Sequence, residues 1–285
     1  MAPQLRKMSS EKTTKPFTFL VLADIHFGQL ADSPEFRVNG KQPGDGSPKR
    51  TSRRDGLVAT VKKLTEKPTA LFVPGDLTSI ASPGEFKGCV EMVLGIADDL
   101  GISRNNIFFT YGNHDTNWRI CELGIERAPF PADEAYDHVA ATIGGLYAPV
   151  KNCVLEGPVP GSGVFQADNH ALFVLNSGFF CAAERTYRHG RIGDEQLKWI
   201  ECAFKKFSSA PGWKLLMVHH HPFNYTYPTP IEDVSCIEEG AEIVDLAGRF
   251  GTDFLFHGHR HHPRLFTELR TEWKFELVPE IRTSG

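Results

Sequence analysis

The sequence predicts a layered α/β sandwich, and two observations lead to this fold class. Short runs of β-branched and aromatic residues alternate with amphipathic helical patterns along most of the 285 residues. The apolar runs are hydrophobic through most of their length, which is typical of strands that other layers cover on both faces. A chain of this length can bury a sizeable core, so we expect one large α/β domain.

Six apolar runs are expected as strands, over residues 17–23, 70–74, 106–111, 171–176, 214–218 and 253–257. Four segments between them are expected as helices from the spacing of their apolar residues. The first two present the faces Leu57, Val58, Val61, Leu64 and Phe86, Val90, Val93, Leu94, Ala97. Asp194 is expected as the N-cap of the third helix, which carries Leu197, Ile200, Phe204 and Phe207. The fourth covers 238–250.

The domain organisation follows from where this alternation breaks. Residues 1–15 are polar and are expected as a flexible N-terminal segment, followed by a single domain over 16–285. Residues 28–55 are rich in Gly, Pro, Ser and Arg and are expected as a loop insertion. Residues 116–165 show a mixed, partly helical pattern and are expected as a cap insertion over a site. Whether residue 285 is the natural C-terminus stays open.

Composition narrows the class of protein. The net charge of −4 shows no global bias toward nucleic acid or acidic membranes. No apolar run approaches the ~18 residues of a membrane span, and the polar N-terminus contains no secretion signal. The six cysteines form no Cys-x-x-Cys pair, which is typical of reduced thiols. We therefore expect a cytoplasmic protein without a membrane partner. Its oligomeric state stays open.

Polar side chains follow five of the predicted strands. They are Asp24 and His26, then Gly75-Asp76, then Gly112-Asn113-His114-Asp115, then His219-His220-His221, and last His257-Gly258-His259-Arg260-His261. In an open α/β sheet, ligands bind outside the carboxyl ends of the strands. Asp-x-His and Gly-Asp are weak alone, because capping pairs and polar turns have the same composition, whereas Gly-His-x-His is the most specific of the motifs. Five of them in order at strand ends indicate one shared site.

The ligand types indicate a site for two metal ions. One carboxylate would bridge the two cations, which lie ~3.5–4 Å apart in such sites. Neutral imidazoles and an amide oxygen would fill the remaining positions. The mixture of nitrogen and oxygen ligands, without thiolates, suits two divalent or trivalent transition-metal ions among Mn, Fe, Zn, Co and Ni.

At this point the sequence resembles the calcineurin-like metallophosphoesterases. The family pattern is Asp-x-His, Gly-Asp, Gly-Asn-His-Asp/Glu, an isolated His and Gly-His-x-His. Here it is found between Asp24 and His261, with every expected ligand type present. The motif order and the stretch "GRIGDEQLKWIE" are similar to the class III cyclic-nucleotide phosphodiesterases of this family. The resemblance implies a four-layer α/β/β/α sandwich of two mixed sheets flanked by helices.

The resemblance also implies a role for each site residue. One metal would be bound by Asp24, His26, Asp76 and His261, and the other by Asp76, Asn113, His220 and His259. Spacing to Pro222 favours His220 over His219, and the choice between them stays open. A hydroxide that bridges the metals would attack phosphorus, because metal binding lowers the pKa of water to about 7. His114 would protonate the leaving group, and Asp115 would orient the His114 ring.

The expected function is hydrolysis of a phosphodiester, with a cyclic nucleotide among the candidates, or of a phosphomonoester. The 28–55 loop carries basic residues that could reach phosphate, namely Arg37, Lys41, Lys49, Arg50, Arg53 and Arg54. Aromatic residues that could stack a base are Trp118, Phe130, Phe223, Tyr225 and Tyr227. A DNA nuclease of the same superfamily is one alternative, disfavoured by the acidic charge balance. A scaffold that uses the same fold is another, disfavoured by the complete ligand set.

Overall fold

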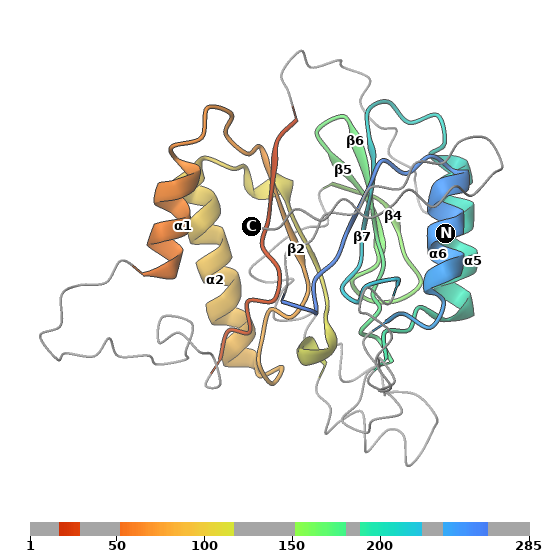
Figure 1. Cartoon of the computed structure of the whole chain (residues 1–285), viewed down its shortest axis with the longest axis horizontal. Helices are drawn as coiled ribbons and strands as arrows, with labels where there is room; N and C mark the ends of the chain where they lie inside the picture. Colours follow the sequence, from red (N-terminus) through yellow and green to blue (C-terminus); the bar gives the residue numbers. More distant parts are fainter. Residues whose placement is uncertain (1–16, 29–51, 117–151, 181–188, 224–235, 262–285) are drawn as a thin grey trace, which may run out of the picture.

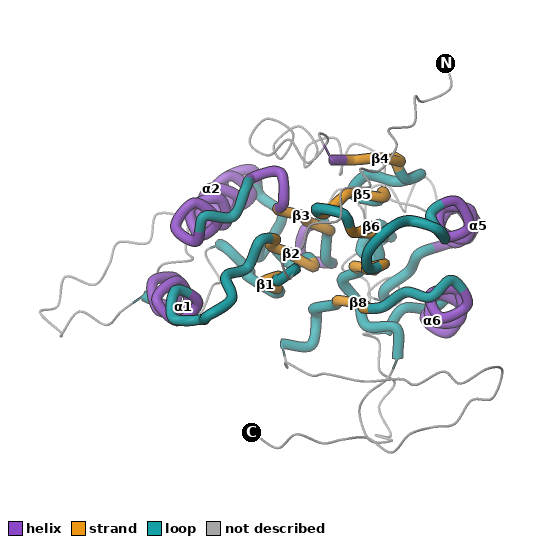
Figure 2. The backbone as a smooth tube through the Cα atoms, turned by 90° about the horizontal axis from the view of Figure 1, so that it is seen from above, coloured by secondary structure: helices purple, strands orange, loops and turns teal. Residues whose placement is uncertain are grey.

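The computed structural model describes residues 17–28, 52–116, 152–180, 189–223 and 236–261. Two β-sheets face each other in the middle of the molecule, and a pair of helices covers the outer face of each sheet (Figure 1). Figure 2 shows the resulting order of layers, from α1 and α2 across the two sheets to α5 and α6. The predicted α/β/β/α sandwich is confirmed.

The first sheet is formed by three parallel strands in chain order: β1 (Phe19–Val21), β2 (Ala70–Pro74) and β3 (Ile107–Thr110). All five residues of β2 are buried, which explains why its sequence is an unbroken apolar run. The strands predicted over 17–23, 70–74 and 106–111 are thus confirmed. Within the described residues this sheet is parallel, and the mixed pairing occurs in the second sheet.

Two helices cover the outer face of the first sheet, α1 (Arg53–Val61) and α2 (Pro83–Leu100). A capping box of Ser82 and Glu85 starts α2, and Gly101 ends it in a left-handed conformation. The Arg54 guanidinium forms an ion pair with Asp99 of α2, so this predicted phosphate contact instead ties the two helices together. Leu64 was predicted on the apolar face of the first helix, but it lies beyond the end of α1 and is exposed.

The second sheet has five strands in the order β4 (Cys153–Glu156), β5 (Gly163–Ala167), β6 (His170–Val174), β7 (Lys214–Met217) and β8 (Phe254–Phe256). β5 pairs antiparallel with both of its neighbours, β4 and β6, whereas β7 pairs parallel with β6 and β8 pairs parallel with β7. β4 and β5 were not predicted as strands. Their residues up to 165 belong to the sheet and not to a cap. The cap insertion stays a prediction for residues 117–151, which lie outside the described part.

Two helices cover the second sheet, α5 (Gly193–Lys206) and α6 (Gly240–Arg249). Asp194, the predicted N-cap, lies inside the first turn of α5. The Glu239 carboxylate at the start of α6 accepts hydrogen bonds from the backbone N–H groups of Ile192 and Gly193, at 3.0 and 2.9 Å. A side chain from another element therefore satisfies the amides at the start of α5, which sequence spacing cannot reveal.

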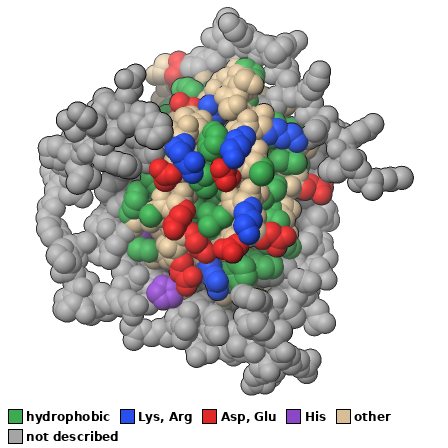
Figure 3. All heavy atoms as spheres, turned by 90° about the vertical axis from the view of Figure 1, so that its right-hand side faces the viewer, with side chains coloured by type: hydrophobic (Ala, Val, Ile, Leu, Met, Phe, Trp, Pro, Cys, Tyr) green, Lys and Arg blue, Asp and Glu red, His purple; other side chains and the backbone are tan. Residues whose placement is uncertain are grey.

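The outer face of α5 and α6 carries basic and acidic side chains intermixed (Figure 3). Two pairs are spaced one helical turn apart: Lys205–Glu201 at 2.7 Å and Arg249–Asp245 at 2.8 Å. Such exposed pairs contribute little to stability but keep charges of one sign from gathering. This face is therefore not an extended basic surface of the kind that nucleic acid requires.

Several predicted segments lie outside the described residues. They include the N-terminal segment 1–15 and the loop insertion 28–55 apart from Gly28 and residues 52–55, where α1 begins. The single domain over 16–285 stays a prediction. No helix in the described part of the chain is both long and apolar enough to cross a membrane.

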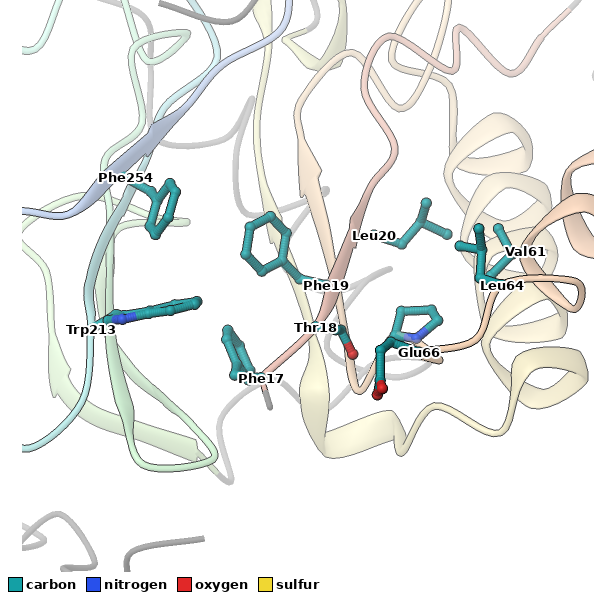
Figure 4. A pocket seen from close by; sticks show the side chains of 10 residues that line it. Phe17, Thr18, Phe19, Leu20, Val61, Leu64, Glu66, Trp213 and Phe254 are labelled. Atoms are coloured by element: carbon teal, nitrogen blue, oxygen red, sulfur yellow. The ribbon is translucent and has the colours of Figure 1, made fainter. Parts of the chain in front are cut away.

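A hollow of about 350 Å³ opens between the edges of the two sheets (Figure 4). Phe17 and Phe19 of the β1 segment line it together with Trp213 and Phe254, which stand at the starts of β7 and β8. The candidate metal ligands follow the opposite, carboxyl ends of these strands. The hollow therefore lies at the far end of the strands from the candidate site.

Phe72 is the centre of the contact between the two sheets. Its ring is fully buried and packs against Phe108 of the first sheet and within a cluster that includes Leu172 and Met217 of the second. Phe72→Ala is expected to lower the free energy of unfolding by about 3–5 kcal/mol, because the cavity spans both sheets. Urea denaturation measures this loss. The matched control is Leu64→Ala at a 52% exposed side chain, expected within about 0.5 kcal/mol of the parent protein.

Candidate metal centre

The structure brings the predicted ligands into two neighbouring groups at the carboxyl ends of the strands. One group consists of Asp24, His26, Asp76 and His261, and the other contains His219, His220 and His259. Within each group the ligand atoms all lie within 4.8 Å of one another. Residues separated by more than 200 positions therefore meet, because parallel strands end at the same edge of a sheet.

The first group joins the turns after β1, β2 and β8. The Nε2 atoms of His26 and His261 are 3.0 Å apart, and His26 Nε2 is 3.4 Å from Asp76 Oδ2. Asp24 Oδ1 is 3.9 Å from His261 Nε2 and also accepts a 2.6 Å hydrogen bond from the backbone N–H of His259. Asp24 thus connects the loop of the first group to that of the second.

The second group is centred on His219 Nε2. This atom is 3.2 Å from Asn113 Oδ1, 3.2 Å from His259 Nδ1 and 3.3 Å from Asp76 Oδ2. The other ring nitrogen of His219, Nδ1, donates a 2.8 Å hydrogen bond to the Pro74 carbonyl, which can only accept. In the neutral ring the Nε2 lone pair therefore faces further lone-pair atoms. Lone-pair atoms that converge in this way are what a metal cation requires of its ligands.

Asp76 belongs to both groups. Its Oδ2 atom is 3.4 Å from His26 Nε2 and 3.3 Å from His219 Nε2, while Oδ1 accepts a 2.9 Å hydrogen bond from the His114 backbone N–H. The side chain is buried. Burial opposes its ionisation, but the surrounding imidazoles, foremost His219, outweigh burial and hold the pKa of Asp76 well below its usual range. Asp76 Oδ2 therefore lies within reach of both groups of candidate ligands.

The imidazoles of the two groups have different protonation preferences. Burial lowers the pKa of His26 to about 4 and that of His259 to about 3, so both rings are neutral at pH 7, as metal ligation requires. Burial acts in the same direction on His219, but the Asp76 carboxylate overcomes it and the pKa rises to about 9. The electrostatic field around His219 Nε2 thus favours a positive charge.

His219 and His220 both lie beside His259, with ring centroids 5.1 and 4.5 Å from its ring, but their other contacts differ. Leu215 and Met217 pack between the sheets, whereas Leu216 and Val218 pack among the core residues beneath α5 and α6. Continuing this alternation directs residue 219 toward the first sheet and residue 220 away from it. His220 Nδ1 is accordingly 2.8 Å from Ser177 Oγ on the neighbouring β6 loop. The spacing to Pro222 favoured His220, but His219 holds the contacts to Asp76 and Asn113.

Backbone strain is concentrated at the candidate ligands. Seven non-glycine residues in the described part of the chain have positive φ, and five of them are ligand candidates: Asp24, His26, Asp76, His259 and His261, with φ between 47° and 74°. L-residues seldom adopt this conformation, and each instance costs of order 1–3 kcal/mol. The fold thus maintains the directions of these side chains against the preference of their backbone.

The glycine before Asn113 is required for a steric reason. A Cβ atom on Gly112 would lie 2.2 Å from Asp76 Oδ1, so the turn after β3 can approach the Asp76 carboxylate only without a side chain. Gly75, directly before Asp76, has φ of 87°, and its Cβ would lie 2.6 Å from His219 Nδ1. These contacts explain why glycine precedes both candidate ligands in the sequence.

His114 lies beside the first group but is oriented differently from what was predicted. Its ring packs edge-on against His26, with centroids 4.7 Å apart, and its Nδ1 donates a 3.0 Å hydrogen bond to the Ser79 carbonyl. Asp115 was expected to orient this ring, but that contact is not formed. The backbone carbonyl of Ser79 takes this position. No sequence motif marks such a carbonyl, because any residue type supplies one.

Asp115 instead connects the turns after β2 and β3. Its buried carboxylate accepts hydrogen bonds from the backbone N–H groups of Leu77, Thr78 and Gly112, at 3.1, 2.9 and 2.9 Å, and from Thr78 Oγ1 at 3.0 Å. Burial, together with the charge of Asp76, raises the pKa of Asp115 to about 6 against these hydrogen bonds. Asp115 therefore holds Asp76 and Asn113 at a fixed separation.

The predicted substrate contacts lie largely outside the described residues. This holds for Trp118, Phe130, Tyr225 and Tyr227 and for the basic residues between 37 and 50. Phe223 is described and is 40% exposed, directly after the His219–Pro222 turn.

A two-sheet sandwich with histidine, aspartate and asparagine ligands gathered at its strand ends defines the class of the protein as a metal-dependent hydrolase. The family model of the calcineurin-like phosphoesterases matches residues 17–263, nearly the whole chain. The chain belongs to this family. It is accordingly a phosphoester hydrolase.

The solved structures that are similar to this chain include the following two. A dimetal phosphatase from Danio rerio has a TM-score of 0.47 and 14% identity, with 86% of this chain and 82% of that chain covered. A protein described as a 5′-nucleotidase from Staphylococcus aureus, in complex with α-ketoglutarate, has a TM-score of 0.43 and 13% identity. The match covers 90% of this chain and 46% of that one. No curated protein matches the chain.

Gly112→Ala tests the steric account of the site. The added Cβ is expected to displace the Asp76 carboxylate and to lower the Mn²⁺ retained after gel filtration by at least half, because Asp76 belongs to both groups. The control is Gly84→Ala in α2, where a Cβ would meet no heavy atom within 4 Å. Equal Mn²⁺ content in both variants and the parent, measured by atomic emission, would contradict the account.

Proposed function

We propose that the chain hydrolyses a small phosphodiester at a site for two metal ions. The first metal position is formed by Asp24, His26, Asp76 and His261, and the second by Asp76, Asn113, His219 and His259. This proposal takes His219 in place of His220. The observation that carries it is the position of Asp76 Oδ2, within 3.4 Å of His26 Nε2 and 3.3 Å of His219 Nε2.

The donor set supports transition metals. It consists of imidazole nitrogens, carboxylate oxygens and one amide oxygen, a mixture that suits Mn, Fe, Zn, Co or Ni. The hydrogen bond from His219 Nδ1 to the Pro74 carbonyl fixes the tautomer that ligation through Nε2 requires. When bound, two such cations polarise phosphoryl oxygens and activate water as a nucleophile.

His114 is the residue proposed to protonate the leaving oxygen. Its Nδ1 proton is committed to the Ser79 carbonyl, so Nε2 is the ring atom that gains and releases a proton. The contact with His26 places the ring at the edge of the first metal position. Asp115 has a structural role, because its carboxylate accepts hydrogen bonds from both turns that carry Asp76 and Asn113.

The motif order supports a phosphodiester as the substrate. It resembles the class III cyclic-nucleotide phosphodiesterases, so a cyclic nucleotide is the first candidate and a phosphomonoester the second. The DNA-nuclease alternative is disfavoured by the acidic charge balance of the chain, which has a net charge of −4. A scaffold role alone has less support still, since a scaffold needs none of these ligands.

The first test of this function uses metal-stripped protein resupplied with Mn²⁺. We expect hydrolysis of bis-(p-nitrophenyl) phosphate to depend on Mn²⁺ and to exceed that of p-nitrophenyl phosphate, with cyclic AMP as the first natural candidate. Preference for the monoester would replace the diester proposal by a phosphatase. Absence of turnover with Mn²⁺, Fe²⁺, Zn²⁺, Co²⁺ and Ni²⁺ would contradict hydrolysis at this site.

Substitutions of Asp76 and His114 are expected to affect metal binding and proton transfer separately. Asp76→Ala should remove both metals and all activity, because it bridges the two positions. His114→Ala should retain the metals and lower kcat by about 10²–10⁴-fold on a diester with a poor leaving group. The effect should shrink for p-nitrophenolate, which needs no proton. Equal losses on both substrates would contradict the acid role of His114.

The adjacent histidines give a matched pair of variants. His219→Ala is expected to lower the bound Mn²⁺ from two ions to one per chain, because His219 Nε2 lies 3.2 Å from Asn113 Oδ1 and 3.3 Å from Asp76 Oδ2 at the second position. His220→Ala is expected to retain two ions and to lower stability through the loss of its contact with Ser177. Mn²⁺ stoichiometry by atomic emission distinguishes them. The reverse pattern would restore His220 as the ligand.

A further inference from the structure

The six exposed large apolar side chains of the described residues lie at three places. Leu64, Trp213 and Phe254 line the hollow at the starts of the strands, and Val21 lies on the edge strand β1. The other two are Ile80 and Phe223, which follow the turns that carry Asp76 and His219. Ile80 has the highest exposure of the six, at 56%. An exposed apolar side chain beside a polar site is where ligand contacts are expected.

The loop that carries Ile80 is firmly attached on both sides. Thr78 Oγ1 lies 2.9 Å from the His114 carbonyl oxygen and 3.0 Å from Asp115 Oδ1, and Ser79 Oγ donates to the His26 carbonyl at 2.8 Å. The Ile80 backbone N–H donates to Glu85 Oε2 at 3.0 Å. Because the backbone on each side of Ile80 is hydrogen-bonded, its exposure is a property of the folded loop.

This loop places Ile80 one peptide away from the ring proposed to protonate the leaving group. The Ser79 carbonyl that accepts the 3.0 Å hydrogen bond from His114 Nδ1 is bonded directly to the Ile80 nitrogen. The His114 ring in turn contacts His26. Ile80 thus directly follows the residue whose carbonyl holds the His114 ring, and its side chain is exposed.

We propose that Ile80 is a specificity-determining residue that contacts the leaving group of the substrate. The leaving alcohol must reach His114, and any part of it that extends beyond the ring meets the Ile80 side chain. The site then selects phosphodiesters whose leaving group has an apolar or aromatic face, such as an aryl ring or a nucleoside base. Burial of that face against Ile80 strengthens binding without altering the bond-breaking step. This inference rests on the proposed function.

Ile80→Ser in the Mn²⁺-loaded protein tests the contact. We expect the KM for bis-(p-nitrophenyl) phosphate to rise about fivefold to tenfold, with kcat changed less than twofold. The inhibition constant of inorganic phosphate should stay the same, because phosphate has no organic group to contact residue 80. Ile80→Val should restore most of the binding. Leu64→Ser is the matched control, since Leu64 is 52% exposed but lines the distant hollow.

Two results would overturn the contact. One is an unchanged KM in Ile80→Ser, and the other is an equal weakening of phosphate and diester, which would indicate a disturbed metal site. If the parent protein hydrolyses nothing, the proposed function fails, and calorimetric titration with diphenyl phosphate still measures the Ile80 contact. Binding that Ile80→Ser weakens at least fivefold would support it, whereas equal binding or none by the parent protein would refute it.

Discussion

The position of the Asp76 carboxylate is the constraint on which the rest of the site depends. A buried anion needs positive or hydrogen-bonding partners in every direction. Here the Asp76 carboxylate has imidazoles on both sides and the His114 backbone N–H on its other oxygen. Glycine at 112 follows from the same requirement, because a side chain there would overlap Asp76 Oδ1. Both groups of candidate ligands approach this one oxygen atom, Asp76 Oδ2, so each depends on the same geometry.

Asp115 stabilises the position of Asp76 through the turns on either side of it. Its carboxylate joins the turns after β2 and β3 through backbone hydrogen bonds, which holds two neighbouring strand ends together. The backbone at Asp24, His26 and Asp76 has positive φ. This strained conformation persists because hydrogen bonds of this kind and the packed sheets hold the turns in place. The stability of the sandwich thus offsets local strain that places the ligands. The Ile80 loop depends on the same network through Thr78 and Ser79.

Much of the fold could be predicted from the chain. The six strands with continuous apolar runs were found, because such runs are a strong compositional signal. β4 and β5 were missed because Glu156 and Gln166 interrupt their apolar character and both strands are only partly buried. The start of α5 was misplaced for another reason, since its cap is Glu239 of a distant segment. Local patterns cannot report a partner 46 residues away.

The sequence by itself determined which residue types meet and at which strand ends, because ligand chemistry and strand pattern are local properties. Only the tertiary structure gave His219 its contacts to Asp76 and Asn113 and His220 its contact to Ser177, since these depend on which side of β7 faces the first sheet. It also showed Ser79, and not Asp115, at the His114 ring. The physical reason is common to both cases. The direction of a side chain and the carbonyl it meets are set by packing between layers that lie far apart in the sequence.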